Sequence, residues 1–167
     1  MSTAVAATSQ PAIPVRRPTA PHLALRSGHR EHVRRIVVGV DGSPNSLAAL
    51  SRAIVQARVR AAELDIVQVI PDDADEAAAS AARAALRELV ARCAPDGVDV
   101  PVRLRVERGQ PSVVLLVVSA GAELLIIGAR EHSAHGNMLG GQTVPRCLDY
   151  AQCDVDVCAD HHDEHRS

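Results

Sequence analysis

Cysteine and histidine side chains gather near the end of the chain, where they are candidate metal ligands. Zinc prefers thiolate and imidazole donors, and both kinds occur within a short stretch here. The side chains concerned are Cys153, Cys158, His161, His162 and His165. Their spacing contains no Cys-x2-Cys pair, and histidines in a polar tail are commonly solvated. We therefore predict no metal site at this end of the chain.

The residue patterns of the common hydrolases are missing from the sequence. It contains no Gly-x-Ser-x-Gly elbow, no Walker phosphate loop and no Ser-Gly-Gly-x-Asp-Ser loop of the ATP pyrophosphatase kind. Four dispersed cysteines without an export signal indicate reduced thiols rather than a disulfide framework. A regulatory thiol at Cys147 or Cys153 is the alternative to buried, inert side chains, which we favour. We predict that the protein is not an enzyme.

Composition narrows the class of protein further. The 167 residues suit one domain with tails, and they include no Trp, no Phe and one Tyr, so aliphatic side chains must form the core. A net charge of -2 provides no basic face for nucleic acid. We find neither an apolar run of the roughly 18 residues that a membrane span needs nor a secretory signal. The sequence thus predicts a cytoplasmic protein that binds neither membranes nor nucleic acid.

The pattern of the sequence changes twice along the chain. Residues 1–33 contain four prolines and scattered arginines without helical or strand periodicity, which is typical of a flexible arm. A docking arm for an acidic partner is the alternative interpretation of this segment. We place the folded domain at residues 34–159 and a polar tail at 160–167.

Apolar runs and helical repeats alternate through the domain. The strands are expected at residues 36–40, 64–70, 98–106, 124–127 and 153–158. The helices between them are expected at 44–61, from residue 72 or 73 to 94, at 110–121 and at 141–151. Such alternation predicts a doubly wound, Rossmann-like α/β fold with a five-stranded parallel sheet.

Burial patterns predict the order of the strands. The strands at 36–40 and 124–127 are apolar throughout, as expected for strands that are buried on both faces. The strand at 98–106 alternates apolar and polar residues and contains Pro101, which marks an edge strand. The strand order 3-2-1-4-5 satisfies both requirements.

Asp41 and Gly128 end the two strands that are central in this order. The direction of the chain reverses between these strands, and such sheets bind ligands beyond their carboxyl ends at this point. Asp41 is therefore a candidate ligand contact, although an Asp after a strand also serves as a turn or helix cap. Gly128, with Gly140 and Gly141, either approaches a ligand or only shapes a tight loop.

A spaced glycine pattern follows the fourth predicted strand. Gly128-Ala129-Arg130-Glu131 is followed by nine residues and then by Gly141-Gln142-Thr143. This pattern resembles the Gly-x2-Gly-x9-Gly-Ser/Thr signature of the universal stress protein family. Further segments resemble the same family, in order and with the right spacing: Val40-Asp41-Gly42-Ser43, Arg108-Gly109-Gln110-Pro111, residues 121–128 and residues 138–141. The resemblance covers Arg34 to about Cys158.

The resemblance implies a fold like that of the adenine nucleotide alpha hydrolases and a stress-response regulator that binds ATP or ADP, with no metal beyond nucleotide-associated magnesium. In ATP-binding members, glycines let the backbone approach the phosphates and a helix N-terminus adds donors. The implied nucleoside contacts are Asp41, Val69, Ile127 and Gly128. The implied phosphate contacts are Gly141, Gln142 and Thr143.

Two positions differ from the family pattern. Glu131 replaces the second glycine, and two unit charges about 4 Å apart repel by about 4 kcal/mol at an effective dielectric of 20. Gln142 replaces the Ser or Thr, although its amide can donate and Thr143 offers a hydroxyl one position later. We predict weak nucleotide binding. The alternative is a nucleotide-free protein-interaction module of the same fold.

The resemblance also implies a homodimer and a protein partner that the sequence does not identify. In the family, the last strand commonly pairs across the dimer interface. Asp154 and Asp156 occupy alternate positions of that strand here. Because charges on a sheet edge can block pairing, these aspartates weaken the expected edge contact.

Overall fold

The structure is a computed structural model that describes residues 33–129 and 142–159. Within these residues, five parallel strands form one sheet in the order β3-β2-β1-β4-β5. The elements follow one another as β1 (Arg35–Val40), α1 (Pro44–Arg60), β2 (Glu63–Ile70), α2 (Glu76–Cys93), β3 (Val102–Arg108), α3 (Pro111–Ser119), β4 (Leu124–Gly128), α4 (Thr143–Tyr150) and β5 (Asp154–Cys158). The predicted fold and strand order are confirmed. The predicted arm at 1–33, apart from Val33, and the tail at 160–167 lie outside the described residues.

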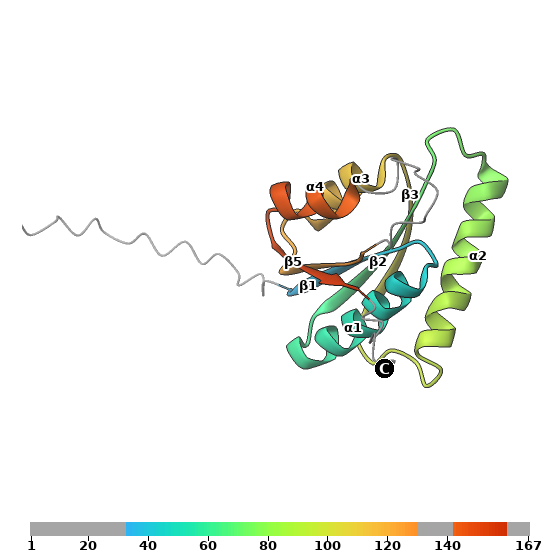
Figure 1. The fold of residues 1–167 in the computed structure, drawn as a ribbon. Helices are drawn as coiled ribbons and strands as arrows, with labels where there is room; N and C mark the ends of the chain where they lie inside the picture. The colour runs from blue at the N-terminus through green and yellow to red at the C-terminus, as the bar shows by residue number, and fades with distance from the viewer. Residues whose placement is uncertain (1–32, 130–141, 160–167) are drawn as a thin grey trace, which may run out of the picture. The chain divides into compact units, whose positions relative to one another are not determined.

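Helices cover both faces of the sheet. Figure 1 shows α3 and α4 on one face and α1 and α2 on the other. Because side chains alternate along a strand, β1 contributes to both layers. Ile36 and Val38 pack with α1 and α2, and Val37 packs with α3 and α4. Burial on both faces explains why this strand is a continuous apolar run.

None of the helices in the described part of the chain has the length and apolar character that crossing a bilayer requires.

The edge strand β3 is shorter than the predicted strand. It begins at Val102, whereas the alternating pattern starts at residue 98. Pro101 has no N–H to donate to a ladder, and its carbonyl alone bonds the neighbouring strand by accepting from the Leu64 amide at 2.9 Å. Val102 and Leu104 are 36% and 39% exposed, which agrees with the predicted position at an edge.

The helix α2 begins later than its predicted start at residue 72 or 73. Asp75 is the residue that caps it, because its Oδ1 accepts a hydrogen bond from the Ala78 amide at 2.7 Å. That side-chain bond satisfies one of the free amides of the first turn. The predicted start at Asp72 or Asp73 is therefore wrong by two or three residues, and Asp75 fills the role of the cap.

The other edge strand, β5, carries the two aspartates that were expected to hinder pairing. Asp154 is exposed at the start of the strand. Asp156 is held by Arg52 of α1, whose guanidinium donates a charge-assisted hydrogen bond to its carboxylate. The charge of Asp156 is therefore compensated within the chain.

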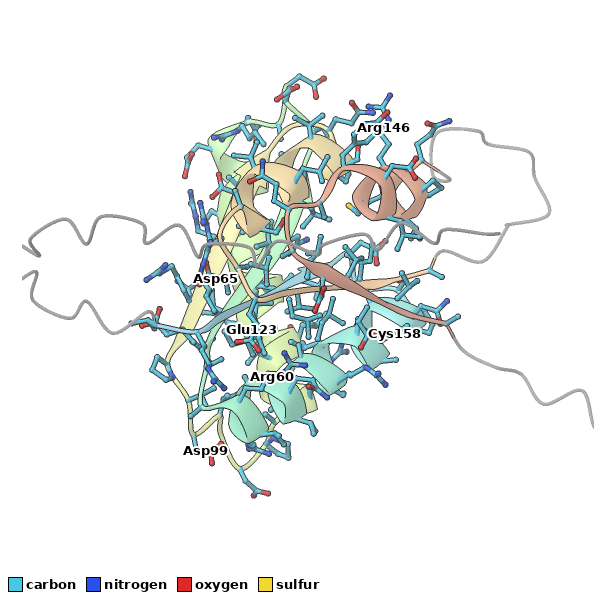
Figure 2. The ribbon with its side chains drawn as sticks, turned by 90° about the vertical axis from the view of Figure 1, so that its left-hand side faces the viewer. Arg60, Asp65, Asp99, Glu123, Arg146 and Cys158 are labelled. Atoms are coloured by element: carbon cyan, nitrogen blue, oxygen red, sulfur yellow. The ribbon has the colours of Figure 1, made fainter. Side chains whose placement is uncertain are left out.

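A buried ion pair joins β1, β2 and α3. The side chain of Asp65 is 1% exposed, and its Oδ2 lies 3.3 Å from Nη1 of Arg35. The same guanidinium donates to the carbonyls of Val118 at 3.0 Å and Ala120 at 2.7 Å. A cation at the end of α3 is favourable for the helix dipole. Figure 2 shows Asp65 on the sheet.

Candidate functional site

The carboxyl ends of β1, β2 and β4 bring most of the predicted site residues to one edge of the sheet. The strand β1 lies between the other two, pairing with β2 up to Val40 and Gln68 and with β4 up to Gly39 and Ile127. The next residue on each strand lies at the same edge. Four predicted nucleoside contacts are thereby gathered there: Asp41, Val69, Ile127 and Gly128.

The start of α4 lies at the same edge, because this helix leads from the carboxyl end of β4 back to the start of β5. Gln142 occupies the N-cap position, is exposed and makes no side-chain cap hydrogen bond. Thr143 is the half-buried first residue of the helix. Gly141 and Glu131 lie outside the described residues. The predicted phosphate half of the site is therefore described only at Gln142 and Thr143.

Asp41 has a structural role in the turn that leads into α1. Its Oδ1 accepts a hydrogen bond from the Ser43 amide at 3.0 Å. Ser43 in turn caps α1, because its Oγ accepts from the Ser46 amide at 3.3 Å. The turn interpretation of Asp41 is thus confirmed. The residue is also exposed.

Gly128 packs against the backbone of the first turn of α1. A Cβ at this position would lie 2.6 Å from the carbonyl carbon of Asn45 and 2.7 Å from the amide nitrogen of Ser46. Such distances are far below van der Waals contact, and the obstacle is main chain that cannot rotate away. Packing alone therefore requires a glycine here, whether or not a ligand binds.

Asn45 is a site residue that the sequence did not reveal. It is 6% exposed, and its side-chain amide donates to the carbonyl of Ala129. The Ala129 amide donates to the carbonyl of Cys158 at 2.7 Å. Ala129, the residue after Gly128 in the glycine pattern, is therefore held by one hydrogen bond to its carbonyl and one from its amide. The available signal was a polar side chain in a first helical turn, before the apolar repeat begins at Leu47.

The thiols near α4 are poor candidates for nucleophiles. Cys147 is fully buried, and burial raises the pKa of its thiol to about 11. Burial also raises the pKa of the half-buried Cys153 thiol. Both groups are thus protonated near neutral pH, and the thiol is the unreactive form. Residues 33–129 and 142–159 contain no group of three His, Cys, Asp or Glu side chains placed to hold a metal ion, and the tail histidines lie outside them.

Comparison with known proteins gives consistent matches. The universal stress protein family matches residues 32–158. Universal stress protein Rv2624c of Mycobacterium tuberculosis is 30% identical over 131 residues, which are 75% of this chain and 48% of that protein. A crystal structure of a universal stress protein in complex with cAMP is 26% identical, with a TM-score of 0.62 and coverage of 76% of this chain and 97% of that chain. Universal stress protein UspA from Lactobacillus plantarum has a TM-score of 0.63 at 23% identity, covering 75% of this chain and 97% of its own. This chain spans about half the length of the mycobacterial relatives that it matches.

Proposed function

Since this chain belongs to the universal stress protein family, we propose that it is a stress-response regulator that binds an adenine nucleotide weakly. One observation carries the proposal: Asp41 and Gly128 end two paired neighbouring strands where the sheet order reverses. Parallel α/β sheets hold their ligands at this place. The relative solved with cAMP supports an adenine nucleotide as the class of ligand. ATP or ADP, with its magnesium ion, is the ligand that we propose.

The described residues fit the nucleoside half of such a ligand. Asp41 has an exposed carboxylate, which accepts hydrogen bonds from hydroxyl groups such as those of ribose. Val69 is a half-buried apolar side chain at the same edge, suited to the face of a base. Gly128, on the other side of Asp41 from Val69, adds no side chain to this edge.

The phosphate half fits less well, which supports weak binding. The first amides of α4 donate no hydrogen bond to the Gln142 side chain, so they are suited to donate to a phosphate. Glu131, which replaces the second glycine of the family pattern, adds a negative charge to the segment between β4 and α4. Repulsion between like charges lowers the affinity without removing the nucleoside contacts.

A second candidate function is a protein-interaction module that binds no nucleotide. It is supported by the structural roles of two predicted contacts, because Asp41 forms the turn before α1 and Gly128 is needed for packing against Asn45. These residues would be retained in a chain that had lost its ligand. For either function we propose a cytoplasmic homodimer without catalytic turnover, acting on a protein partner.

Isothermal titration of the full chain with magnesium ATP tests the nucleotide proposal. We expect weak, saturable binding and no release of ADP above background. Asp41→Asn keeps an acceptor for the Ser43 amide but removes the charge, and it is expected to weaken binding about tenfold or more, which is about 1.4 kcal/mol. Asp96→Asn is the matched control, since Asp96 is an exposed carboxylate after the end of α2, at the opposite edge of the sheet.

A gain-of-binding variant separates the two candidate functions. Glu131→Gly with Gln142→Ser restores the family pattern and is expected to bind ATP about tenfold more tightly or better, because it removes a like charge. If the wild type gives no saturable heat and this variant does, the native protein is the nucleotide-free module. If neither protein binds ATP, the adenine-nucleotide proposal is overturned, because even the variant with the family pattern has no working site.

A further inference from the structure

Ser112, in the first turn of α3, has a buried hydroxyl without a hydrogen-bond partner. The residue is 1% exposed, and its Oγ meets no donor or acceptor within the described part of the chain. A buried polar group that is left unpaired costs free energy, whereas an alanine here would fill nearly the same volume without that cost. Such groups are rare in folded proteins. A ligand that binds at this place would provide the missing partner.

The direction of α3 brings Ser112 to the carboxyl edge of the sheet. The helix leads from the carboxyl end of β3 back to the amino end of β4, so its first turn lies at that edge. Ser112 and Leu115 are both buried, one turn apart on the side of α3 that faces the sheet. Leu115 lies over β1, because a Cβ on Gly39 would be 3.0 Å from its Cδ1. Ser112 is nearer to the edge by about 4.5 Å, the rise of three helical residues. It therefore lies beneath α3 beside the end of β1, which Asp41 follows.

The end of β2 lies beneath the same helix. Helix α3 contacts both β1 and β2, and the half-buried Val69 of β2 packs against the cluster of side chains beneath α3 and α4. The proposed phosphate contacts begin α4, which follows β4 on the opposite side of β1 from β2. A nucleotide that lies across this edge with its phosphates at α4 has its base at β2 and α3. Ser112 thus belongs to the end of the site that holds the base.

The hydroxyl of Ser112 is suited to the polar edge of a purine. Adenine has ring nitrogens that accept hydrogen bonds and an exocyclic amine that donates them, and a serine hydroxyl pairs with either kind of atom. Rotation about the Cα–Cβ bond moves Oγ between staggered positions, so the hydroxyl can turn toward a base without a shift of the helix. Gln110 makes no side-chain cap hydrogen bond at the start of α3, so the amides of this turn add donors at the same place.

We propose that Ser112 is a further ligand contact of the nucleotide site, with its hydroxyl hydrogen-bonded to the adenine base. This inference rests on the nucleotide binding proposed above and names a residue that contributes to the choice of base. A base without a matching atom leaves the hydroxyl unpaired, and sites built around a hydrogen bond reject such analogues.

Isothermal titration of Ser112→Ala with magnesium ATP tests this contact. Loss of one hydrogen bond to the base is expected to raise the dissociation constant about fivefold or more. The midpoint of urea unfolding should stay at or above the wild-type value, because no hydrogen bond within the protein is lost. Ser119→Ala is the matched control, since Ser119 is a buried serine at the other end of α3 whose Oγ donates to the Leu116 carbonyl at 3.4 Å. This control should lower the unfolding midpoint and leave ATP binding unchanged.

ATP analogues provide a readout that altered folding would not produce. In each analogue one ring nitrogen of the base is replaced by carbon, or the exocyclic amine is removed. One of them should bind equally to the wild type and to Ser112→Ala, because it lacks the atom with which the hydroxyl pairs. If Ser112→Ala binds ATP as tightly as the wild type, or weakens every analogue to the same degree, the contact with the base is overturned and the nucleotide proposal stands. A wild type that binds no ATP overturns both.

Discussion

Gly128 lies so close to the main chain of Asn45 that no side chain fits between the two residues. An added Cβ would stand 2.6 Å from the carbonyl carbon of Asn45 and 2.7 Å from its oxygen. This approach brings the end of β4 against the first turn of α1, within reach of the hydrogen bond from the Asn45 amide to Ala129. The two residues thus form one joint between β4 and α1, at the edge where the nucleotide is proposed to bind.

Replacing Gly128 by Ala tests the first half of this joint. The added methyl group would collide with backbone, so we expect the free energy of unfolding to fall by about 1–3 kcal/mol, the usual cost of overpacking. Urea denaturation measures this change. Gly39→Ala is the control, because its Cβ would meet the end of the Leu115 side chain at 3.0 Å, and that side chain can shift. An equal or smaller loss in Gly128→Ala than in Gly39→Ala would contradict the proposed joint.

Replacing Asn45 by Ala tests the second half. The half-buried Ala129 carbonyl would lose the amide that donates to it, so we expect the free energy of unfolding to fall by about 1 kcal/mol, the net contribution of a typical hydrogen bond. Because Ala129 begins the segment that leads to Gly141, we also expect weaker binding of ATP. Gln56→Ala on the same helix removes an amide whose oxygen accepts a hydrogen bond from Arg60, away from this joint, and it should change neither property. Unfolding curves and ATP titrations that match the wild type in Asn45→Ala would refute this role.

Removing the buried carboxylate of Asp65 tests its ion pairs, which join it to Arg35 at 3.3 Å, Arg103 at 3.6 Å and Arg105 at 3.8 Å. A fully buried pair that loses one partner is destabilised by about 3–5 kcal/mol. We expect about 3 kcal/mol for Asp65→Ala, the low end of that range, because Arg35 keeps its two carbonyl acceptors at the end of α3. Asp99→Ala is the control: its pair with Arg58 is exposed, and its removal should leave the unfolding midpoint nearly unchanged. If the two variants had equal unfolding midpoints, the buried ion pairs of Asp65 would stabilise the fold no more than the exposed pair of Asp99.

The sequence contained enough information for the fold because burial leaves a direct mark on composition. Strands with two covered faces carry few polar side chains, and each needs a partner as Asp65 of β2 does, so the wholly apolar residues 36–40 and 124–127 identified the centre of the sheet. Pro101 correctly indicated an edge strand, although it lies directly before the first residue of β3 and not within the strand. Local capping was harder to predict, because Asp72, Asp73 and Asp75 all have a side chain that can accept from a helical amide.

The joint at the candidate site could not be predicted in the same way. The hydrogen bond from Asn45 to Ala129 connects residues 84 positions apart, and no periodic pattern links their types. Gly128 was recognised from its place in a glycine pattern, which predicted an approach to phosphate. Its contact with the Asn45 backbone depends on how α1 crosses the end of β4, which only the packed structure shows.

The buried thiol of Cys147 predicts a loss of stability in alkali. Burial raises its pKa to about 11 in the folded protein, and the neighbouring Cys153 adds to this effect. In the unfolded chain the pKa of a cysteine is about 8.5. Between these values the unfolded chain has released the proton and the folded chain has kept it. The unfolded state then binds fewer protons, so the free energy of unfolding falls as the pH rises.

This contribution is complete below about pH 8 and is lost progressively as the pH rises toward about 11, for a total of about 3.4 kcal/mol. Urea denaturation at about pH 8 and about pH 10.5 measures it, with Cys147→Ala as the comparison. The variant is less stable at the lower pH because it leaves a small cavity, but its stability should fall less between the two values, by about 2 kcal/mol. Other titrating groups are shared by both proteins, so the difference in slope isolates this thiol. A variant that loses stability as steeply as the wild type would mean that the folded protein does not hold Cys147 protonated.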